Sequence, residues 1–548
     1  MHEDLASKIE KLTVELTNVL GVVGTKEESN VSEKVFKTLR EMKYFKKHPE
    51  LVKYVPVKND KLGRKSVLAI VKGEKGNSKK AVICIGHTDT VGISDYGNFK
   101  KYATKPYELL DKLKEVSLPA EALKDLQSGE YLFGRGIFDM KCGDATLMSI
   151  MESISDNVEE FEGNLLFAGV CDEEGNSGGM LSVVPELIRL KEEEGFDYTA
   201  VLDTDYMAPR YVGDNTRYVY VGTVGKLMPT FYIVGKETHV GEPYKGLDPN
   251  QIAGAITNKI NLNVKYCDIA EGEVSLPPIT LRQQDLKEEY SVQIAKTAYL
   301  YFNFSTHKST PDEVINMMAK GAQEAFQDVI DDLNVQYKEY CKMSDFPYEA
   351  LPWKARVMTY DELYRKVKEE KGEAVDNLIK KLSDEMIDDP KIDERAFGLR
   401  IVQEVHKMWS DNDPVVIAYF SAPYYPHIYV EGKKEKEEKL LNAVKDAANV
   451  LDTKYDIVVK KFYPYISDLS YASAPKEDRV IDALKDNMPG YGTKYNLPLK
   501  EMQQLDLPVV NIGPFGKDAH KFTERLEREY SFSVAPKIVY NTILNLLK

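Results

Sequence analysis

Cysteine is scarce in this chain, with 5 residues among 548. So few thiols in so long a polypeptide make a poor disulfide framework, and their odd number leaves one unpaired. Long apolar runs are missing as well, because no stretch approaches the roughly 18 uninterrupted apolar residues that a membrane helix needs. The sequence also has no internal repeat, low-complexity tract or glycine-serine linker. These absences argue against a disulfide-stabilised scaffold, a membrane-spanning protein and a repeat array.

Positive charge is in deficit, since 73 Lys and Arg residues face 88 Asp and Glu residues. The resulting net charge of −15 argues against nucleic acid and anionic membranes as partners, because both need basic patches. The amino-terminal stretch MHEDLASKIEKLTVELTNVLGVVG is charged and helix-patterned, unlike the basic stub and apolar run of a signal peptide. We therefore expect a cytoplasmic protein.

The amino-acid composition is that of a soluble globular protein, with 43% hydrophobic and 29% charged residues. A chain of 548 residues is too long for one core, so roughly two to four domains are expected. The stretches SVLAIVKG, KKAVICIGHTDT, NLLFAGVC and YTAVLDTD predict buried strands, and GDATLMSIMESISDNVEEF predicts a helix between them. This alternation predicts an α/β fold with a mixed, largely parallel sheet flanked by helices. Ligands of such sheets gather at the carboxyl ends of the strands.

The predicted pattern of strands and helices changes near residue 216 and returns to the earlier pattern near 413. RYVYVGTVGKLMPTFYIVG has the period-2 alternation of antiparallel strands, and charged helical patterns follow it. DPVVIAYFSAPYYPHIYVE then begins another buried strand, and further helix and strand patterns follow. We predict one α/β domain in two parts, residues 1–215 and 413–548, split by an inserted α+β domain at 216–412.

The stretch LLFAGVCDEEGNSGGM, residues 165–180, runs from an apolar strand directly into Asp172, Glu173 and Glu174. Three adjacent like charges repel one another and resist removal from water, so the arrangement is costly unless positive charge lies nearby. Since a metal ion would supply that charge, the stretch indicates a metal site.

Other candidate ligands follow other apolar runs. His87 and Asp89 lie in CIGHTDTVG, Asp139 lies in LFGRGIFDMKCGD, and His520 lies in GPFGKDAHKFTERLE, where we expect it to open the last helix. Each residue alone is a weak signal, because a lone strand-end histidine is more often structural and a strand-end Asp is often a helix cap. Together they form the mixed nitrogen and oxygen ligand set that zinc, manganese or cobalt accepts.

These motifs, in this order, resemble the M20 family of metallopeptidases, which includes aminoacylases, dipeptidases and succinyl-diaminopimelate desuccinylase. GHTDTVG is similar to the first family signature, which makes His87 a metal ligand and Asp89 the residue that orients it. GRGIFDMKCG is similar to the second, which makes Asp139 the carboxylate that bridges two ions. CDEEGNSGG is similar to the third, with Glu173 as general base and Glu174 as ligand of the ion opposite His87.

The resemblance implies two more ligands and a zinc-exopeptidase-like fold. TAVLDTDY offers Asp203 and Asp205 for the position after the next strand, and counting from the strand favours Asp203. His520 matches the final family histidine, which a Glu follows four residues later, as Glu524 does here. In the family an inserted lid domain supplies a histidine that stabilises the oxyanion in a neighbouring subunit's site, and His239 matches it. A homodimer through the lid is therefore implied, with the alternative that an enlarged lid replaces the partner within one chain.

The implied reaction is hydrolysis of an amide or peptide bond in a small substrate, such as an N-acyl amino acid or a dipeptide. A water bridging two divalent metal ions would attack, with Glu173 as general base; zinc is the first choice of metal, with Mn²⁺ and Co²⁺ as alternatives. A rival hypothesis is a non-catalytic, metal-stabilised binding or scaffold member of the same fold. A mononuclear hydrolase outside the family is a third hypothesis, and it would leave Asp139 without a bridging role.

The sequence also departs from the family pattern. The gap between Asp89 and Asp139 is long, the lid is enlarged, and Asn303 and Thr306 occur where many members carry a substrate-binding arginine. Recognition of a substrate carboxylate by the usual lid arginine is therefore not expected. The length and the lid most resemble a family branch named for arginine utilization, which points to arginine or ornithine catabolism.

Overall fold

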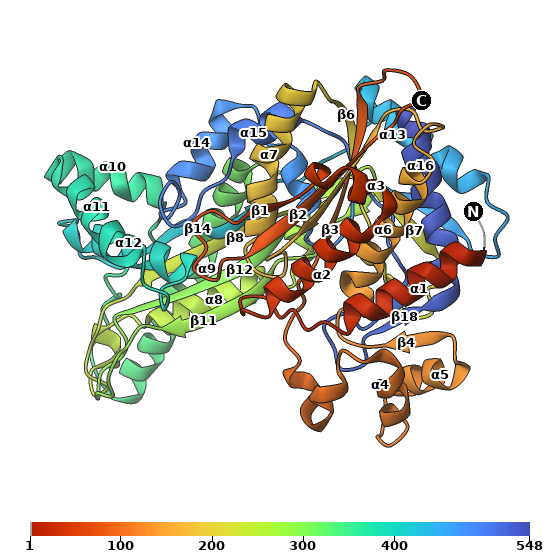
Figure 1. Cartoon of the computed structure of the whole chain (residues 1–548). Helices are drawn as coiled ribbons and strands as arrows, with labels where there is room; N and C mark the ends of the chain where they lie inside the picture. Colours follow the sequence, from red (N-terminus) through yellow and green to blue (C-terminus); the bar gives the residue numbers. More distant parts are fainter. Residues whose placement is uncertain (1–2) are drawn as a thin grey trace. The chain divides into compact units, whose positions relative to one another are not determined.

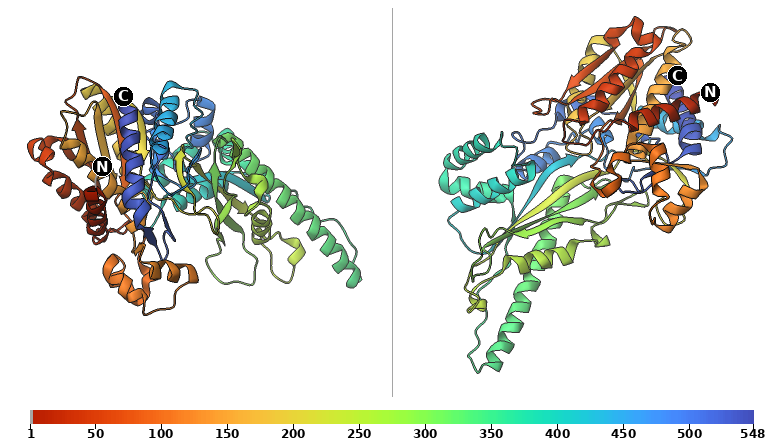
Figure 2. Two further views of the ribbon diagram at one scale, coloured as in Figure 1. Left: turned by 90° about the vertical axis from the view of Figure 1, so that its right-hand side faces the viewer. Right: turned by 60° about the horizontal axis from the view of Figure 1, so that its bottom comes forward.

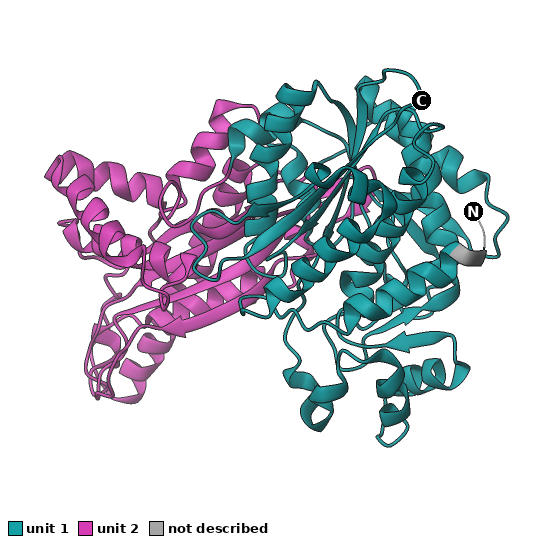
Figure 3. Cartoon of the chain, in the orientation of Figure 1, with its two compact units in different colours: residues 1–223, 428–474, 498–548 teal, residues 224–427, 475–497 magenta. Residues whose placement is uncertain are grey.

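The computed structural model describes residues 3–548, which fall into two compact units (Figure 3). The first unit contains the chain up to residue 223 together with 428–474 and 498–548, and the second contains 224–427 and 475–497. The chain therefore passes between units near residues 223 and 427, whereas the sequence pattern predicts domain boundaries near 215 and 412. Residues 475–497 also belong to the second unit, which the sequence pattern does not indicate.

The first unit is built on a sheet which, in the described part of the chain, has eight strands in the order β1-β2-β5-β3-β6-β16-β7-β15. The strands are β1 (Val52–Pro56), β2 (Lys65–Lys72), β3 (Lys80–His87), β5 (Asn164–Val170), β6 (Asp197–Asp203), β7 (Arg217–Val221), β15 (Ile457–Lys460) and β16 (Val509–Asn511). The central strands β5, β3, β6 and β16 run parallel, while the pairs β1–β2, β2–β5 and β16–β7 are antiparallel. The mixed, largely parallel sheet predicted from the sequence is confirmed.

Helices cover both faces of this sheet (Figure 1). Helix α6 (Cys142–Ser155) leads from β3 to β5 and helix α7 (Gly178–Glu194) leads from β5 to β6. Because β5 and β6 flank β3 on opposite sides, right-handed crossovers place α6 and α7 on opposite faces. Burial on both faces explains why β3 and β5 are almost continuously apolar. The other helices of this layer are α1 (Glu3–Thr17), α2 (Glu28–Glu41), α3 (Lys43–Lys47), α13 (Glu435–Asn449), α15 (Leu499–Leu505) and α16 (Ala535–Leu547).

The long gap between Asp89 and Asp139 forms a small helical segment within the first unit. It contains a 3₁₀ segment (Ser94–Tyr102), α4 (Pro106–Leu113) and α5 (Ala120–Ser128), and both α-helices pack against β4 (Tyr131–Phe133). Strand β4 pairs with β18 (Arg525–Glu527), which pairs in turn with β17 (Gly516–Lys517). The segment therefore lies beside the chain that carries His520, more than 380 residues away in sequence (Figure 1).

The second unit has its own sheet, ordered β11-β12-β8-β14-β13. The strands are β8 (Gly225–Val234), β11 (Ile279–Asp285), β12 (Thr297–Thr306), β13 (Val357–Thr359) and β14 (Val415–Tyr425). The flanking helices are α8 (Pro249–Ile260), α9 (Pro311–Met343), α10 (Tyr360–Lys371), α11 (Ala374–Met386), α12 (Glu394–Met408) and α14 (Asp478–Asp486). Helix α9 is the long green helix of Figure 2, packed along α8.

Two strands explain why the unit boundaries differ from those predicted. Strand β7, whose alternation resembles the strands that follow it, hydrogen-bonds to β16 in the first sheet. Strand β14, expected to resume the first domain, pairs along most of its length with β8 in the second sheet. Local patterns specify a strand but not its partner, so the sheet assignment depends on these long-range pairings. Within residues 3–548, no helix is both long and apolar enough to cross a membrane.

Candidate metal centre

The candidate ligands meet because their strands are parallel neighbours. His87 ends β3, Glu173 and Glu174 follow the end of β5, and Asp203 ends β6. In the sheet His87 lies opposite Val170 of β5, and Ile85 lies opposite Asp203 of β6. The three strands therefore deliver their final residues to one edge of the sheet.

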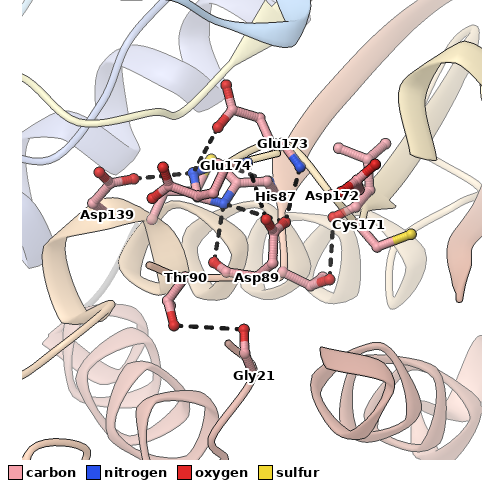
Figure 4. A network of polar contacts seen from close by, with 12 residues as sticks. Gly21, His87, Asp89, Thr90, Asp139, Cys171, Asp172, Glu173 and Glu174 are labelled. Carbon is pink, nitrogen blue, oxygen red and sulfur yellow. Dashed lines mark hydrogen bonds and ion pairs between the residues drawn. The ribbon is translucent and has the colours of Figure 1, made fainter. Parts of the chain in front are cut away.

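Asp139 occupies the middle of the site. It lies in the turn Ile137–Lys141 that leads into α6. One carboxylate oxygen, Oδ1, is 3.0 Å from Nε2 of His87, and the other, Oδ2, is 3.0 Å from Nε2 of His520. Nε2 of His520 is also 2.8 Å from Oε1 of Glu174. Figure 4 shows Asp139, His87 and Glu174 turned toward one another.

Two groups of potential ligands share Asp139. His87, Asp139 and Asp205 form one group, and Asp139, Glu174 and His520 form the other; within each group one ligand atom per residue lies within 4.8 Å of the others. Each group combines one imidazole nitrogen with carboxylate oxygens, a donor set that suits Zn²⁺, Mn²⁺ or Co²⁺. The residues present therefore fit a pair of divalent cations with one bridging carboxylate.

The pKa values of the two histidines reflect the negative charge that surrounds them. Burial lowers the pKa of His520, but hydrogen bonds to Asp139 and Glu174 outweigh it and raise the pKa to about 10. Burial also lowers the pKa of His87, and Asp139 together with Glu173 raises it well above its ordinary value. In the ion-free form, protons on both imidazoles thus supply the positive charge among these carboxylates. A cation that binds must displace them, because a metal ligand is a neutral imidazole.

Asp89 connects His87 to the turn that carries Glu173 and Glu174. Its two carboxylate oxygens accept the backbone N–H groups of Glu173 (3.2 Å) and Glu174 (3.0 Å), and the side chain is fully buried. Its main-chain carbonyl accepts from Nδ1 of His87 at 3.1 Å, and its carboxylate Oδ1 lies 3.8 Å from the same nitrogen (Figure 4). Asp89 therefore sets the tautomer and orientation of His87 through its backbone and the position of the next turn through its side chain.

Glu173 lies at the site but in neither ligand group. Its side chain is 10% exposed, and its Oε2 is 3.9 Å from Nε2 of His87. Burial raises the pKa of Glu173 well above its usual range; His87 lowers it and Asp468 raises it further. A carboxylate with a raised pKa accepts a proton more readily near neutral pH.

Asp205, and not Asp203, lies with the other candidate ligands. The strand count favoured Asp203, but its carboxylate accepts the hydroxyl of Ser467 (2.8 Å) and the backbone N–H of Thr204 (2.8 Å). Asp205 comes two residues after the strand ends and joins His87 and Asp139. The partner that engages Asp203, Ser467, is 264 residues away in sequence, so no local count could have found it.

The expectation that His520 opens the last helix is wrong. His520 lies in the loop between β17 and β18, whereas the last helix, α16, begins at Ala535. The charge spacing of KDAHKFTERLERE resembles a helix, but Asp518 (φ 59°) and His520 (φ 64°) adopt left-handed backbone conformations that end any helix. Arg525–Glu527 then pair as a strand with β4.

The three adjacent acids of the opening stretch have different partners. Glu174 faces His520, but the Asp172 carboxylate forms an ion pair with the Arg64 guanidinium, which also contacts Glu28 and Asp60. A metal ion is therefore not the sole source of compensating charge there. Arg64 was not identified from the sequence, because its link to Asp172 spans 108 residues.

Asp468 is a second site residue that sequence reasoning missed. It is 2% exposed and lines a hollow with His87, Glu173, Asp203 and Asp205. Burial raises the pKa of Asp468 well above its ordinary value, while a hydrogen bond with Ser177 and the charge of His87 lower it. The motif YISDLSY, an acid enclosed by apolar and aromatic residues, is the signal that could have revealed it.

The lid candidates lie in the second unit. His239 is exposed in the segment after β8, where its Nδ1 accepts the backbone N–H of Gly241 at 3.0 Å. Asn303 and Thr306 belong to β12, and the Thr306 hydroxyl is 3.1 Å from Nδ1 of His427.

Comparison with known proteins supplies the family. The sequence model of peptidase family M20/M25/M40 matches residues 83–545. The chain is 34% identical to Protein RocB of Bacillus subtilis (strain 168), a match that covers 100% of this chain and 96% of RocB. It is 35% identical to protein YqjN of the same organism, over 98% of this chain and 96% of YqjN.

Among solved structures, a tripeptidase from Staphylococcus aureus subsp. aureus Mu50 matches with a TM-score of 0.53 at 13% identity, covering 99% of this chain and 98% of that one. At this identity the likeness shows a shared fold. The family match, the two full-length relatives and the paired ligand groups agree with one another. The chain belongs to peptidase family M20/M25/M40 and is an enzyme, a metallohydrolase.

Proposed function

We propose that this enzyme hydrolyses an amide or peptide bond of a small substrate at a centre of two divalent cations. The observation that carries the proposal is the position of Asp139, with one carboxylate oxygen 3.0 Å from each of two imidazoles. His87, Asp139 and Asp205 would hold one ion, and Asp139, Glu174 and His520 would hold the other. We thus propose Asp205 as the fourth ligand in place of Asp203. Zn²⁺ is our first choice of metal, with Mn²⁺ and Co²⁺ as alternatives.

The residues of the chain divide the chemistry between them. Bound divalent cations would polarise the substrate carbonyl and acidify a water molecule. Glu173, which neither ligand group uses, takes a proton from the attacking water as that water adds to the carbonyl carbon. It then delivers the proton to the leaving nitrogen as the carbon–nitrogen bond breaks, so the products are a carboxylic acid and an amine. Asp89 orients His87 and holds the turn that carries Glu173.

The second unit is proposed to act as the lid. His239, in its exposed segment, would donate to the developing oxyanion, from the same chain or from the partner of a homodimer formed through the lid. We propose N-acyl amino acids or dipeptides as substrates, within arginine or ornithine catabolism, because the length and lid resemble the family branch named for arginine utilization. A cytoplasmic location stays a prediction from the acidic, cysteine-poor composition of the sequence.

Glu173→Gln tests the assigned base. The variant keeps the size of the side chain and leaves both ligand groups intact, so it should bind cations as the wild type does and lose most turnover. The assay is hydrolysis of a panel of N-acyl amino acids and dipeptides, weighted toward arginine- and ornithine-containing amides, with Zn²⁺, Mn²⁺ or Co²⁺ added. Undiminished hydrolysis by the variant would refute the role of Glu173. Absence of turnover by the fully loaded wild type on every amide would favour the scaffold hypothesis.

A further inference from the structure

His520 is the weakly enclosed member of the ligand set. Its side chain is 45% exposed, whereas the side chains of His87, Asp139 and Glu174 are 3%, 4% and 9% exposed. Packing around the imidazole therefore does little to fix its position, which depends on its contacts with Asp139 and Glu174 and on the backbone of the loop between β17 and β18. This loop contains two left-handed non-glycine residues, Asp518 and His520.

The helical segment between Asp89 and Asp139 packs against this loop. Phe522, two residues after His520, packs against the apolar core of that segment. Its ring lies 5.4 Å from the ring of Tyr96 in an edge-to-face arrangement and 6.4 Å from the ring of Phe99. Aromatic contacts of this kind stabilise the packed arrangement beyond the burial of apolar area.

Ion pairs fix both strands that flank the loop. Asp125 of α5 accepts Nζ of Lys517 from β17 (2.9 Å) and Nε of Arg525 from β18 (2.7 Å). Arg525 also bonds to Asp518, so the start and the end of the loop are tied to each other. Since Asp125 belongs to the helical segment, it ties β17 and β18, which already pair with each other, to that segment.

A third attachment connects the loop to the turn of Asp139. Glu524 accepts Nη1 of Arg135 (2.6 Å) and the backbone N–H of Gly136 (2.7 Å), three residues before Asp139. Nη2 of Arg135 donates in turn to Asp95 of the helical segment (2.7 Å). The helical segment thus contacts Arg135, which precedes the turn of Asp139 and pairs with Glu524 at the end of the His520 loop.

We propose that the helical segment of residues 93–130 positions the His520 loop, with Phe522 as the positioning residue, and so sets the affinity of the second cation group, Asp139, Glu174 and His520. The inference rests on the proposed two-cation centre. It gives a role to the long gap that distinguishes this sequence from compact family members. Residues that hold a ligand in place typically change metal affinity by about 10- to 100-fold when mutated.

The test is calorimetric titration of the metal-free full chain with Zn²⁺, which reads binding without activity. His520→Ala and His87→Ala first identify which binding event belongs to which group. Phe522→Ala should then weaken the His520 event by about 10- to 100-fold and leave the His87 event within about twofold. Phe522→Leu should restore much of the loss, and Leu123→Ala, an exposed apolar residue of α5, should behave as the wild type.

The outcomes separate the two proposals. A wild type that binds fewer than two ions refutes the two-cation centre and, with it, this inference. A wild type that binds two ions, with Phe522→Ala unchanged or with both events weakened equally, refutes the positioning role alone. Circular dichroism of Phe522→Ala checks that the fold persists, and an intact His87 event provides the same check within the titration.

Discussion

Arg64→Met should destabilise the turn that carries Glu173 and Glu174. The Arg64 side chain is 12% exposed, and it pairs with Asp172 (7% exposed), Asp60 (8% exposed) and Glu28 (fully buried). Methionine keeps much of the volume but removes the guanidinium that all three carboxylates share. Breaking a buried pair in this way costs about 3 to 5 kcal/mol.

The effect should reach catalysis through Asp172. This residue has a φ of 67°, its carboxylate accepts the backbone N–H of Gly178 (3.1 Å), and its carbonyl accepts that of Ser177 (2.7 Å). It therefore organises the turn whose next residue is Glu173. Because a shift of about 1 Å in a catalytic group can cost about 100-fold in rate, we expect a loss of that order in kcat.

Hydrogen exchange of the peptide covering residues 171–178 measures local opening directly, and hydrolysis rates measure the consequence. Arg189→Met is the matched control, because Arg189 is 46% exposed and pairs with Glu186 and Glu193 on the surface of α7. Its loss should cost about 0 to 1 kcal/mol. The reasoning fails if Arg64→Met and Arg189→Met open the turn equally and hydrolyse substrate at equal rates.

Two further predictions concern the fourth ligand and the second unit. Asp205→Asn should remove one of two bound ions, whereas Asp203→Asn should keep both; metal analysis showing the reverse would restore Asp203. Burial lowers the pKa of His406 to about 4, so the unfolded chain binds this proton at a higher pH than the folded chain does. The second unit should therefore lose about 3 kcal/mol of stability as pH falls from about 6.5 to 4. His406→Phe should shift the acid unfolding of the second unit to lower pH. The fluorescence of Trp353 and Trp409, which both belong to this unit, follows the unfolding. An unchanged midpoint would contradict the role given to His406.

Much of the first sheet could be predicted because its strands are short, apolar and buried on both faces. His87, Asp139 and Glu174 could be predicted to lie together because each lies at or just after a strand end or in the turn before a helix. Parallel neighbours bring such positions together without any knowledge of register. The choice between Asp203 and Asp205 could not be made in this way, since it depends on a hydroxyl from Ser467.

The remaining errors share one physical origin, which is pairing over long sequence distances. Strand β14 has a buried pattern that fits either sheet, and its hydrogen bonds to β8 decide the outcome. His520 lies in a sequence with helical charge spacing, yet the pairing of β17 with β18 makes its segment a hairpin, and β18 also pairs with β4. Arg64 reaches Asp172 from a distant segment with no metal signature, and Asp468 has only the weak signal of an acid within YISDLSY.

The hydrogen bonds from the turn of Glu173 and Glu174 to the Asp89 carboxylate have a practical consequence for mutagenesis. Both oxygens of this carboxylate engage main-chain N–H groups, so the interaction does not depend on which side chains positions 173 and 174 bear. Exchanging either glutamate should leave the loop backbone where it is. Losses measured in such variants can therefore be attributed to the missing carboxylate and not to a displaced backbone.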